Sequence, residues 1–535
     1  MRSLKHLFER IKNLLELHTP QSLQKYKWPL ISGCFMGCSF IPFPVFFMFF
    51  SVAPLWFFLY QQKKLKEVIV GSWVAQFVTT FIGFNWILYT AHEFGEMNWV
   101  FSFFVLILFC SLANLFIPIA SVLWFWICQK RKLSAFSKLL LLPFLFIICH
   151  SYIPAIFPWN MGYPWLWGEF PAAQTAELWG FRFLNVLFYI FNLLILIISK
   201  HRFDLLGRIA LIKMIGLFLF LNILGWSLKT RLPQPDSVLK TIVVQHNVGS
   251  SAHLKTKTKF RDPRKESLFR IKNLTVKSFI KYNKQKEKIN FILWPEGAYP
   301  FLIHKNKARL PGISDLIEKM ETPLITGGIS RDFRGYSNSL VVLDRKGNIM
   351  KPIYDKVKLL AFGERFPGSQ TLPFLLKLFP YFQSNLQPGT KHQVKNLEGV
   401  QLGFQICYES LFASFTRKLA LDGSQVLINI TNDSWYGSWQ EPWQHFTMTL
   451  ARAIETRRPL IRSTNTGISA AILADGTLQP FSPINKSWYY LYEIPYHKQA
   501  PKTLFMTWGF YIQEMFLLFL LMLIGLDLFY QKRKS

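Results

Sequence analysis

Residues 400–409 read VQLGFQICYE, an apolar run followed at once by a thiol, a phenol and a carboxylate. A short run that combines Val, Leu, Phe and Ile is typical of a buried strand. In α/β proteins the residues that follow such strands gather at one edge of the sheet, where ligands and catalytic groups lie. Val400–Ile406 is therefore expected to be a strand that presents Cys407 at such an edge.

Two other polar residues also follow apolar runs. Glu296 comes directly after INFILWP at 289–295, and Lys356 follows KPIYD at 351–355. A thiol must lose its proton before it attacks a carbonyl, so it needs a base such as Glu296. The oxyanion that forms needs a positive partner, which Lys356 can supply. A glutamate or a lysine at a strand end is, taken alone, more often a surface residue, but together Glu296, Lys356 and Cys407 predict acyl transfer.

Other catalytic signatures are missing from the sequence. It contains no HExxH, no CxxC pair, no phosphate-binding P-loop and no Gly-x-Ser-x-Gly. The sequence therefore predicts a site that uses no metal and no other cofactor.

The segment 229–504 alternates apolar runs with polar stretches. The runs expected as strands are 240–245, 289–294, 323–328, 338–343, 400–406, 425–431, 459–463 and 470–473. The stretches 267–287 and 441–457 are expected as helices. Strands that alternate with helices indicate an α/β domain or an αββα sandwich rather than a barrel of tight hairpins.

Outside this segment the chain is much more apolar. Of its 535 residues 51% are hydrophobic and 17% aromatic, only 17% are charged, and the formal net charge is +31. This composition excludes a disordered chain, a coiled coil, a collagen-like protein and a disulfide-rich mini-protein. Apolar segments joined by loops rich in Lys and Arg are typical of a membrane protein.

The apolar runs predict several membrane spans, each of which needs about 20 residues. They lie at 28–60, 68–91, 98–128, 134–156, 181–199, 207–228 and 505–530. The first run is too long for one span, and Ile41-Pro42-Phe43-Pro44 interrupts it, which gives eight spans in total. The alternative is one long tilted helix and seven spans.

The distribution of Lys and Arg favours eight spans. Basic residues cluster in 1–27, 63–66, 130–132, 200–208 and 532–534, whereas 92–98 and 157–180 contain none. With eight spans every basic connection lies on the cytoplasmic side, together with both termini. The expected organisation is a cytoplasmic N-terminus at 1–27, seven spans in 28–228, an outer catalytic domain at 229–504, an eighth span at 505–530 and a cytoplasmic tail at 531–535.

Charge and cysteine usage refine the view of the outer domain. Its excess of Lys and Arg is explained either by a solvated surface or by attraction to phosphates, and above a membrane lipid headgroups are nearer than nucleic acid. Cys407 is its only cysteine, while Cys34, Cys38, Cys110, Cys128 and Cys149 lie in expected spans. A lone thiol there is either a buried structural residue or a nucleophile.

Several motifs resemble known families. Trp294-Pro295-Glu296, Tyr354-Asp355-Lys356, Phe362-Gly363-Glu364 and Cys407-Tyr408-Glu409 resemble those of the nitrilase superfamily. The segments TNDSWYG at 431–437, RAIE at 452–455 and RSTNTGIS at 462–469, with the flanking spans, resemble the bacterial apolipoprotein N-acyltransferase family. A weaker signature, Gly162-Tyr163-Pro164-Trp165, lies in the membrane half.

The resemblance implies a function that agrees with the residue chemistry. Cys407, with Glu296 as base and Lys356 stabilising the intermediate, would take an acyl chain from a phospholipid. The resulting thioester would pass it to the α-amino group of a lipoprotein's diacylglyceryl-cysteine. Glu364, Tyr408 and Glu409 match supporting positions, the two carboxylates orienting Lys356 and the nucleophile region. The alternative for Glu409 is a salt bridge at a strand end.

The family also implies a setting and partners. The protein is expected in the bacterial inner membrane, as a monomer whose catalytic domain faces the periplasm and binds no nucleic acid. LPFLLKLFPYF at 372–382 suits membrane contact or a core helix, and Trp159–Trp167 suits an interfacial belt.

The sequence departs from the family at two places. Gly297 replaces a common hydroxyl residue, the segment His246–Ser251 is less typical of the family, and the stretch directly after it contains no tryptophan. His150 is expected as a hydrogen-bonded core residue, and His445 as either a core or a cleft residue.

Two other function classes remain open from the residues alone. A membrane-anchored nitrilase-like amidase would hydrolyse a small amide, but would not need eight spans. A transporter or scaffold would carry more ionisable residues in its spans and would not need Glu296, Lys356 and Cys407 together.

Overall fold

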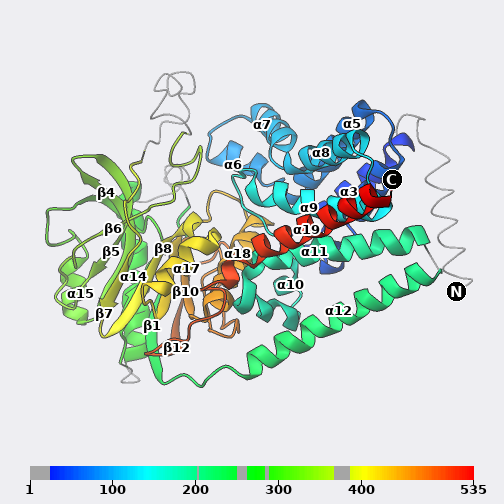
Figure 1. Ribbon diagram of the computed structural model, residues 1–535. Coiled ribbons are helices and arrows are strands. Elements are labelled where there is room, and N and C mark those ends of the chain that lie inside the picture. The colour runs from blue at the N-terminus through cyan, green and yellow to red at the C-terminus, as the bar shows by residue number, and fades with distance from the viewer. Residues whose placement is uncertain (1–23, 202–203, 250–261, 284–287, 367–385, 535) are drawn as a thin grey trace, which may run out of the picture.

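The computed structural model describes residues 24–201, 204–249, 262–283, 288–366 and 386–534. The chain forms a helical part and a β-sandwich that lie side by side (Figure 1). The segment 372–382, most of the expected N-terminal region 1–27 and the residues that directly follow Gly249 lie outside the described residues, so the expectations made for them stay predictions.

The helical part contains the apolar runs of the sequence. Its helices are α3 (Lys27–Gly37), η1 (Val45–Phe49), α4 (Ala53–Gln61), α5 (Leu65–Gly83), α6 (Ile87–Glu93), α7 (Trp99–Leu112), α8 (Phe116–Lys130), α9 (Ala135–Tyr152), α10 (Tyr163–Trp167), η2 (Pro171–Thr175), α11 (Ala176–His201), α12 (Leu205–Thr230), η4 (Gly509–Tyr511) and α19 (Ile512–Lys534). The break expected around Pro42 is present, since α3 ends at Gly37 and the next helix begins at Val45.

Six helical stretches of the described chain are long and apolar enough to cross a membrane. They are Leu65–Gly83, Trp99–Lys130, Ala135–Tyr152, Pro171–His201, Leu205–Thr230 and Gly509–Arg533. The stretch Val45–Gln61 is apolar but shorter, and α3 has 11 residues. The chain is thus a multi-pass helical membrane protein, with six rather than eight stretches of full spanning length.

Two sheets form the sandwich. Its strands are β1 (Ser237–Gln245), β2 (Phe291–Leu293), β3 (Tyr299–His304), β4 (Leu324–Asp332), β5 (Gly335–Leu343), β6 (Tyr354–Asp355), β7 (Val394–Leu397), β8 (Val400–Ile406), β9 (Val426–Thr431), β10 (Leu460–Thr464), β11 (Ala470–Ile472) and β12 (Trp488–Tyr496). One sheet has the order β12-β1-β2-β4-β5-β6, with β3 on β4, and the other has the order β11-β10-β9-β8-β7.

The packing of the sheets makes an αββα sandwich. Apolar residues such as Val243 and Ile325 of the first sheet share one core with Phe404 and Ile428 of the second. The outer face of the first sheet packs on α14 (Pro263–Asn283) and α15 (Ser314–Met320). The outer side of the second sheet contacts α17 (Ala413–Leu421) and α18 (Glu441–Thr456). This architecture is the one expected from the alternating strands and helices.

β12 is not among the strands expected from the sequence. It pairs with β1 in antiparallel register along nine residues, from Ser237 opposite Tyr496 to Gln245 opposite Trp488. The run WYYLYEIPY has little apolar alternation of its own and contains Pro495, which is typical of an edge strand. Its strand state depends on a partner about 250 residues away, which local sequence does not reveal.

α18 joins the sandwich to the helical part. Almost all of its residues are buried, and Figure 1 shows it between the sheets and the bundle. Gln444 Nε2 donates to the carbonyls of Ile41 and Gly83 at 3.1 and 2.9 Å, and its Oε1 accepts from Trp86 Nε1 at 3.2 Å. One side chain thus pairs three buried polar groups of the helical part.

The substitution Gln444→Leu should destabilise the protein. It leaves two carbonyls and one indole N–H unpaired, and each buried unpaired group costs about 1–3 kcal/mol. We expect a clearly lower melting temperature of the purified protein in detergent, whereas the exposed Gln61→Leu should leave it unchanged. Equal melting temperatures for the two variants would contradict this role of Gln444.

Candidate active site

The three predicted chemical groups meet at one edge of the sandwich. Cys407 follows β8, Glu296 lies three residues beyond the end of β2, and Lys356 follows β6. All three are buried: Cys407 is 7%, Glu296 9% and Lys356 1% exposed. The parallel strands β8 and β9 bring further polar residues to the same edge.

Cys407 has a strained backbone. It is the first residue of the short 3₁₀ helix η3 (Cys407–Leu411) and has φ of +50°, a conformation that L-residues rarely adopt. Its carbonyl accepts from Ser410 Oγ at 3.0 Å and faces His445 Nε2 at 3.4 Å. Such strain is found where the fold turns a nucleophile out of the strand direction.

Lys356 is held between two carboxylates. Its Nζ lies 2.9 Å from Glu364 and 3.6 Å from Glu296 Oε1. Asn338 Nδ2 donates to Glu296 Oε1 at 2.6 Å and to Glu364 Oε1 at 2.8 Å. Asn338 was not predicted from the sequence. The only signal was an amide at the start of the apolar run 338–343, where a polar side chain on an inward-facing strand needs a partner.

Burial and charge set the protonation of the site. Burial raises the pKa of Glu296, Lys356 opposes this rise, and Glu364 adds to it. Burial raises the pKa of the Cys407 thiol as well, and the charge of Glu296 raises it further. Burial alone would lower the pKa of Lys356, but Glu364 and Glu296 outweigh it and raise that pKa. The resting site therefore holds a thiol, a cationic lysine and a carboxylate of increased basicity, as base catalysis requires.

Glu409 connects the lysine segment to the nucleophile segment. Its Oε1 accepts from the backbone N–H of Val357 at 2.6 Å and of Lys358 at 3.1 Å. Its Oε2 accepts from Tyr354 Oη at 2.6 Å and from the N–H of Ile406 at 2.8 Å. Among the described residues its hydrogen-bond partners are thus backbone groups and a phenol, not a cation.

Tyr408 points toward the helical part. Its hydroxyl donates to the carbonyl of Ile156, in the loop after α9. Its ring packs edge-on against Phe157 and Phe412. Cys407 is thereby fixed next to the membrane part through its neighbouring residue.

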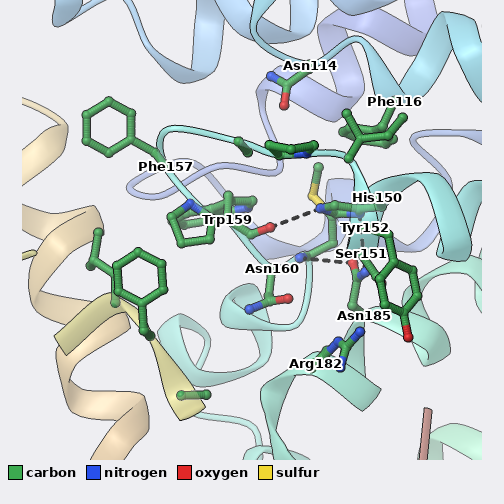
Figure 2. Close-up of a pocket in the computed structure, with 18 of the residues that line it drawn as sticks. Asn114, Phe116, His150, Ser151, Tyr152, Phe157, Trp159, Asn160, Arg182 and Asn185 are labelled. Atoms are coloured by element: carbon green, nitrogen blue, oxygen red, sulfur yellow. Dashed lines mark hydrogen bonds between the residues drawn. The ribbon is translucent and has the colours of Figure 1, made fainter. Parts of the chain in front are cut away.

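A cavity of about 340 Å³ lies beside this loop, between α9, α11 and the segment that follows η3 (Figure 2). His150 lines it, with Nδ1 2.9 Å from Tyr189 Oη and Nε2 3.0 Å from the carbonyl of Trp159. The hydrogen bonds expected for His150 are thus present, but its side chain is half-buried and lines the cavity. Apolar and polar groups, including Arg182 and Asn185, face the same space.

A buried polar network lies behind Cys407. Arg462 Nη2 contacts Asp433 Oδ2 at 2.9 Å, and Asp433 Oδ1 contacts His445 Nδ1 at 3.0 Å. Burial would raise the pKa of Asp433, but Arg462 and His445 lower it to about 2. Gly467 is required here, because a Cβ at that position would overlap Asp433 Oδ2. His445 therefore supports the nucleophile turn from behind.

Three groups of this network have the spacing of metal ligands. Ligand atoms of Asp433, Glu441 and His445 lie within 4.8 Å of one another. Arg462 already places a cation against Asp433, and burial raises the pKa of Glu441, which favours its neutral form. The arrangement is better suited to a hydrogen-bonded support than to a divalent ion.

The substitution Asn338→Leu should alter the pH dependence of Cys407. The Asn338 hydrogen bond lowers the pKa of Glu296, so its loss raises that pKa and protonates the base at higher pH. In the pH profile of the Cys407 alkylation rate, we therefore expect the fall on the acidic side, its acidic limb, to occur at higher pH. Ser337→Ala, which removes a hydroxyl with no partner among the described residues, should leave the limb in place. An unshifted limb in Asn338→Leu would refute the coupling.

Comparison with known proteins agrees with both halves of the chain. Residues 32–194 match the family described as apolipoprotein N-acyltransferase N-terminal domain. Residues 273–489 match the carbon-nitrogen hydrolase family. Among solved structures, a carbon-nitrogen hydrolase from Helicobacter pylori is 19% identical with a TM-score of 0.35, and covers 48% of this chain and 89% of its own.

Curated relatives match over almost the whole length. An apolipoprotein N-acyltransferase from Bdellovibrio bacteriovorus is 36% identical over 94% of this chain and 93% of its own. One from Geobacter metallireducens is 25% identical over 86% of this chain and 87% of its own. On the strength of this similarity, the chain belongs to the apolipoprotein N-acyltransferase family.

Proposed function

We propose that this protein transfers an acyl chain from a glycerophospholipid to the α-amino group of the diacylglyceryl-cysteine of an apolipoprotein, through a thioester on Cys407. The observation that carries the proposal is the arrangement of Glu296, Lys356 and Cys407 directly against the membrane part. Such a position suits two lipid substrates whose reactive groups lie at headgroup depth. Extracting a lipid into water instead would cost about 0.8 kcal/mol per exposed CH₂.

The first half-reaction forms the thioester. Glu296 accepts the thiol proton as Cys407 Sγ attacks the ester carbonyl carbon of the donor. Lys356 Nζ stabilises the oxyanion, because its charge is fixed by Glu364 and Glu296. The intermediate collapses, the C–O bond breaks, and protonated Glu296 gives its proton to the departing lysophospholipid alkoxide.

The second half-reaction releases the product. The neutral α-amine of the acceptor attacks the thioester carbonyl, and Lys356 again stabilises the oxyanion. Glu296 accepts the proton of the amine, the C–S bond breaks, and the thiolate recovers a proton from Glu296. Atoms and charges balance without a cofactor, and the two steps give a ping-pong reaction.

The neighbouring residues hold this geometry. Glu364 orients Lys356, Glu409 fixes the lysine segment to the nucleophile turn, and Tyr408 anchors that turn to the loop after α9. Asn338 adds a donor shared by Glu296 and Glu364. We assign these four residues positioning roles.

The Lys and Arg content of the loops supports a membrane topology. We propose eight spans, counting α3 and the stretch Val45–Gln61 as the first two, with both termini cytoplasmic and the domain 229–504 periplasmic. The basic connections 63–66, 130–132 and 200–208 support this orientation. We further propose a monomer in the bacterial inner membrane.

The intact mass of the purified protein tests the proposal. After incubation with phospholipid and no acceptor, we expect a mass gain of one acyl chain, which disappears when a diacylated lipopeptide is added. Cys407→Ala should show no gain. Cys149→Ala, which removes a buried thiol of α9, should behave like the unaltered protein.

Two results would overturn the proposal. An adduct that persists in Cys407→Ala would place the acyl group elsewhere. An unmodified protein that cleaves small amides would instead favour a nitrilase-like amidase, which the similarity to apolipoprotein N-acyltransferases does not favour.

A further inference from the structure

A large groove separates α12 from the sandwich. It has a volume of about 1,430 Å³ and lies among the C-terminal end of α12, the segment around η2, α18 and the loop 473–478. We name it the α12 groove. Its apolar wall includes Trp167, Trp226, Trp443, Phe446, Leu450 and Phe481. Figure 1 shows α12 diverging from the other helices before the chain enters β1.

The α12 groove and the nucleophile lie on opposite faces of α18. Trp443, Phe446 and Leu450, three or four residues apart, line the groove. His445 and Thr449, on the other face, contact the Cys407 carbonyl at 3.4 Å and Ser410 Oγ at 2.8 Å. A molecule in the α12 groove is therefore separated from Cys407 by the thickness of a helix.

One wall of the groove is formed by the C-terminal end of a helix of spanning length. α12 is one of the helices of spanning length, and only 17% of its most apolar window is buried by protein. Three tryptophans at the groove suit the boundary between hydrocarbon and headgroups. Contact between water and such an apolar wall is unfavourable, so the wall favours binding of an acyl chain.

One buried cation in the groove lacks a full set of partners. Arg457 is 2% exposed and lines the groove. Its Nε pairs with Glu177, and its Nη1 donates to Gln174 Oε1 at 2.7 Å and to the carbonyl of Ala474 at 3.1 Å. Its Nη2 has no partner among the described residues. A buried donor of a charged group that lacks an acceptor is destabilising, so an acceptor is expected there.

Charges of both signs stand at the rim. Lys229 Nζ, at the end of α12, lies 3.4 Å from Asp475 Oδ2. Both residues line the groove, together with Arg457. A cation beside an anion matches a headgroup that carries a phosphate and an ammonium better than it matches a purely anionic ligand.

We propose that the α12 groove binds one zwitterionic glycerophospholipid, distinct from the acyl donor. Its chains lie along the aromatic wall and α12, a phosphate or ester oxygen accepts from Arg457 Nη2, and the headgroup meets Lys229 and Asp475. This lipid is not consumed, because α18 separates it from Cys407. It fills the space between α12 and the sandwich, across whose rim Lys229 contacts Asp475.

Native mass spectrometry of the detergent-purified protein tests this site. The experiment uses Cys407→Ala, so that no lipid is consumed, and phosphatidylethanolamine as the added probe. We expect one retained phospholipid per protein. Ala474→Trp, which fills the groove, and Arg457→Lys, which removes the forked donor, should each reduce the retained fraction at least tenfold. Ile223→Trp, on an exposed part of α12 that does not line the groove, should retain the lipid.

Further variants keep the outcome interpretable. If Ala474→Trp does not fold, Thr230→Trp at the rim of the groove takes its place. In the otherwise unaltered protein, Ala474→Trp should still form the Cys407 acyl adduct, which separates failure of this site from failure of the proposed function. Absence of a retained lipid, equal retention in all variants, or release of the lipid by a diacylated lipopeptide would overturn the proposal.

Discussion

The burial of α18 is the constraint on which the rest of the structure depends. A helix that is buried on nearly all sides and carries polar side chains is stable only if those side chains find hydrogen-bond partners. Gln444 pairs with the backbone of the helical part, His445 and Thr449 reach the nucleophile turn, and Arg457 reaches η2. Because one helix makes all these contacts, it fixes both the position of the sandwich relative to the membrane helices and the geometry of the active site.

The same principle explains the geometry of the nucleophile. Cys407 occupies a left-handed conformation that its own sequence does not favour. Glu409 accepts from the backbone N–H of Val357, Ser410 Oγ bonds to Thr449 of α18, and Tyr408 donates to the carbonyl of Ile156, so three different segments hold the turn. The strain is thus offset by contacts outside the turn, and the thiol faces Glu296 and Lys356 rather than continuing the line of β8.

Sequence reasoning succeeded where the signal is local. The runs at 240–245, 400–406 and 425–431 are strands, and the residues after the strands meet at one edge of the sandwich, Glu296 from one sheet and Cys407 from the other. It missed β12, whose pairing with β1 is non-local, and Asn338, whose importance comes from two carboxylates on other segments. It also gave no sign of the groove beside Arg457, which exists only because α12 diverges.

The sequence by itself determined that this chain has a multi-pass apolar part, an α/β domain and a thiol, a lysine and a carboxylate fit for acyl transfer. These properties follow from hydrophobic periodicity and residue chemistry, which depend only on residues close together in the chain. Only the tertiary structure decided which carboxylates hold Lys356, how Glu409 joins two segments, and that α18 separates the nucleophile from the α12 groove. Those facts depend on contacts between residues far apart in the chain, and such contacts form only when burial brings the elements together.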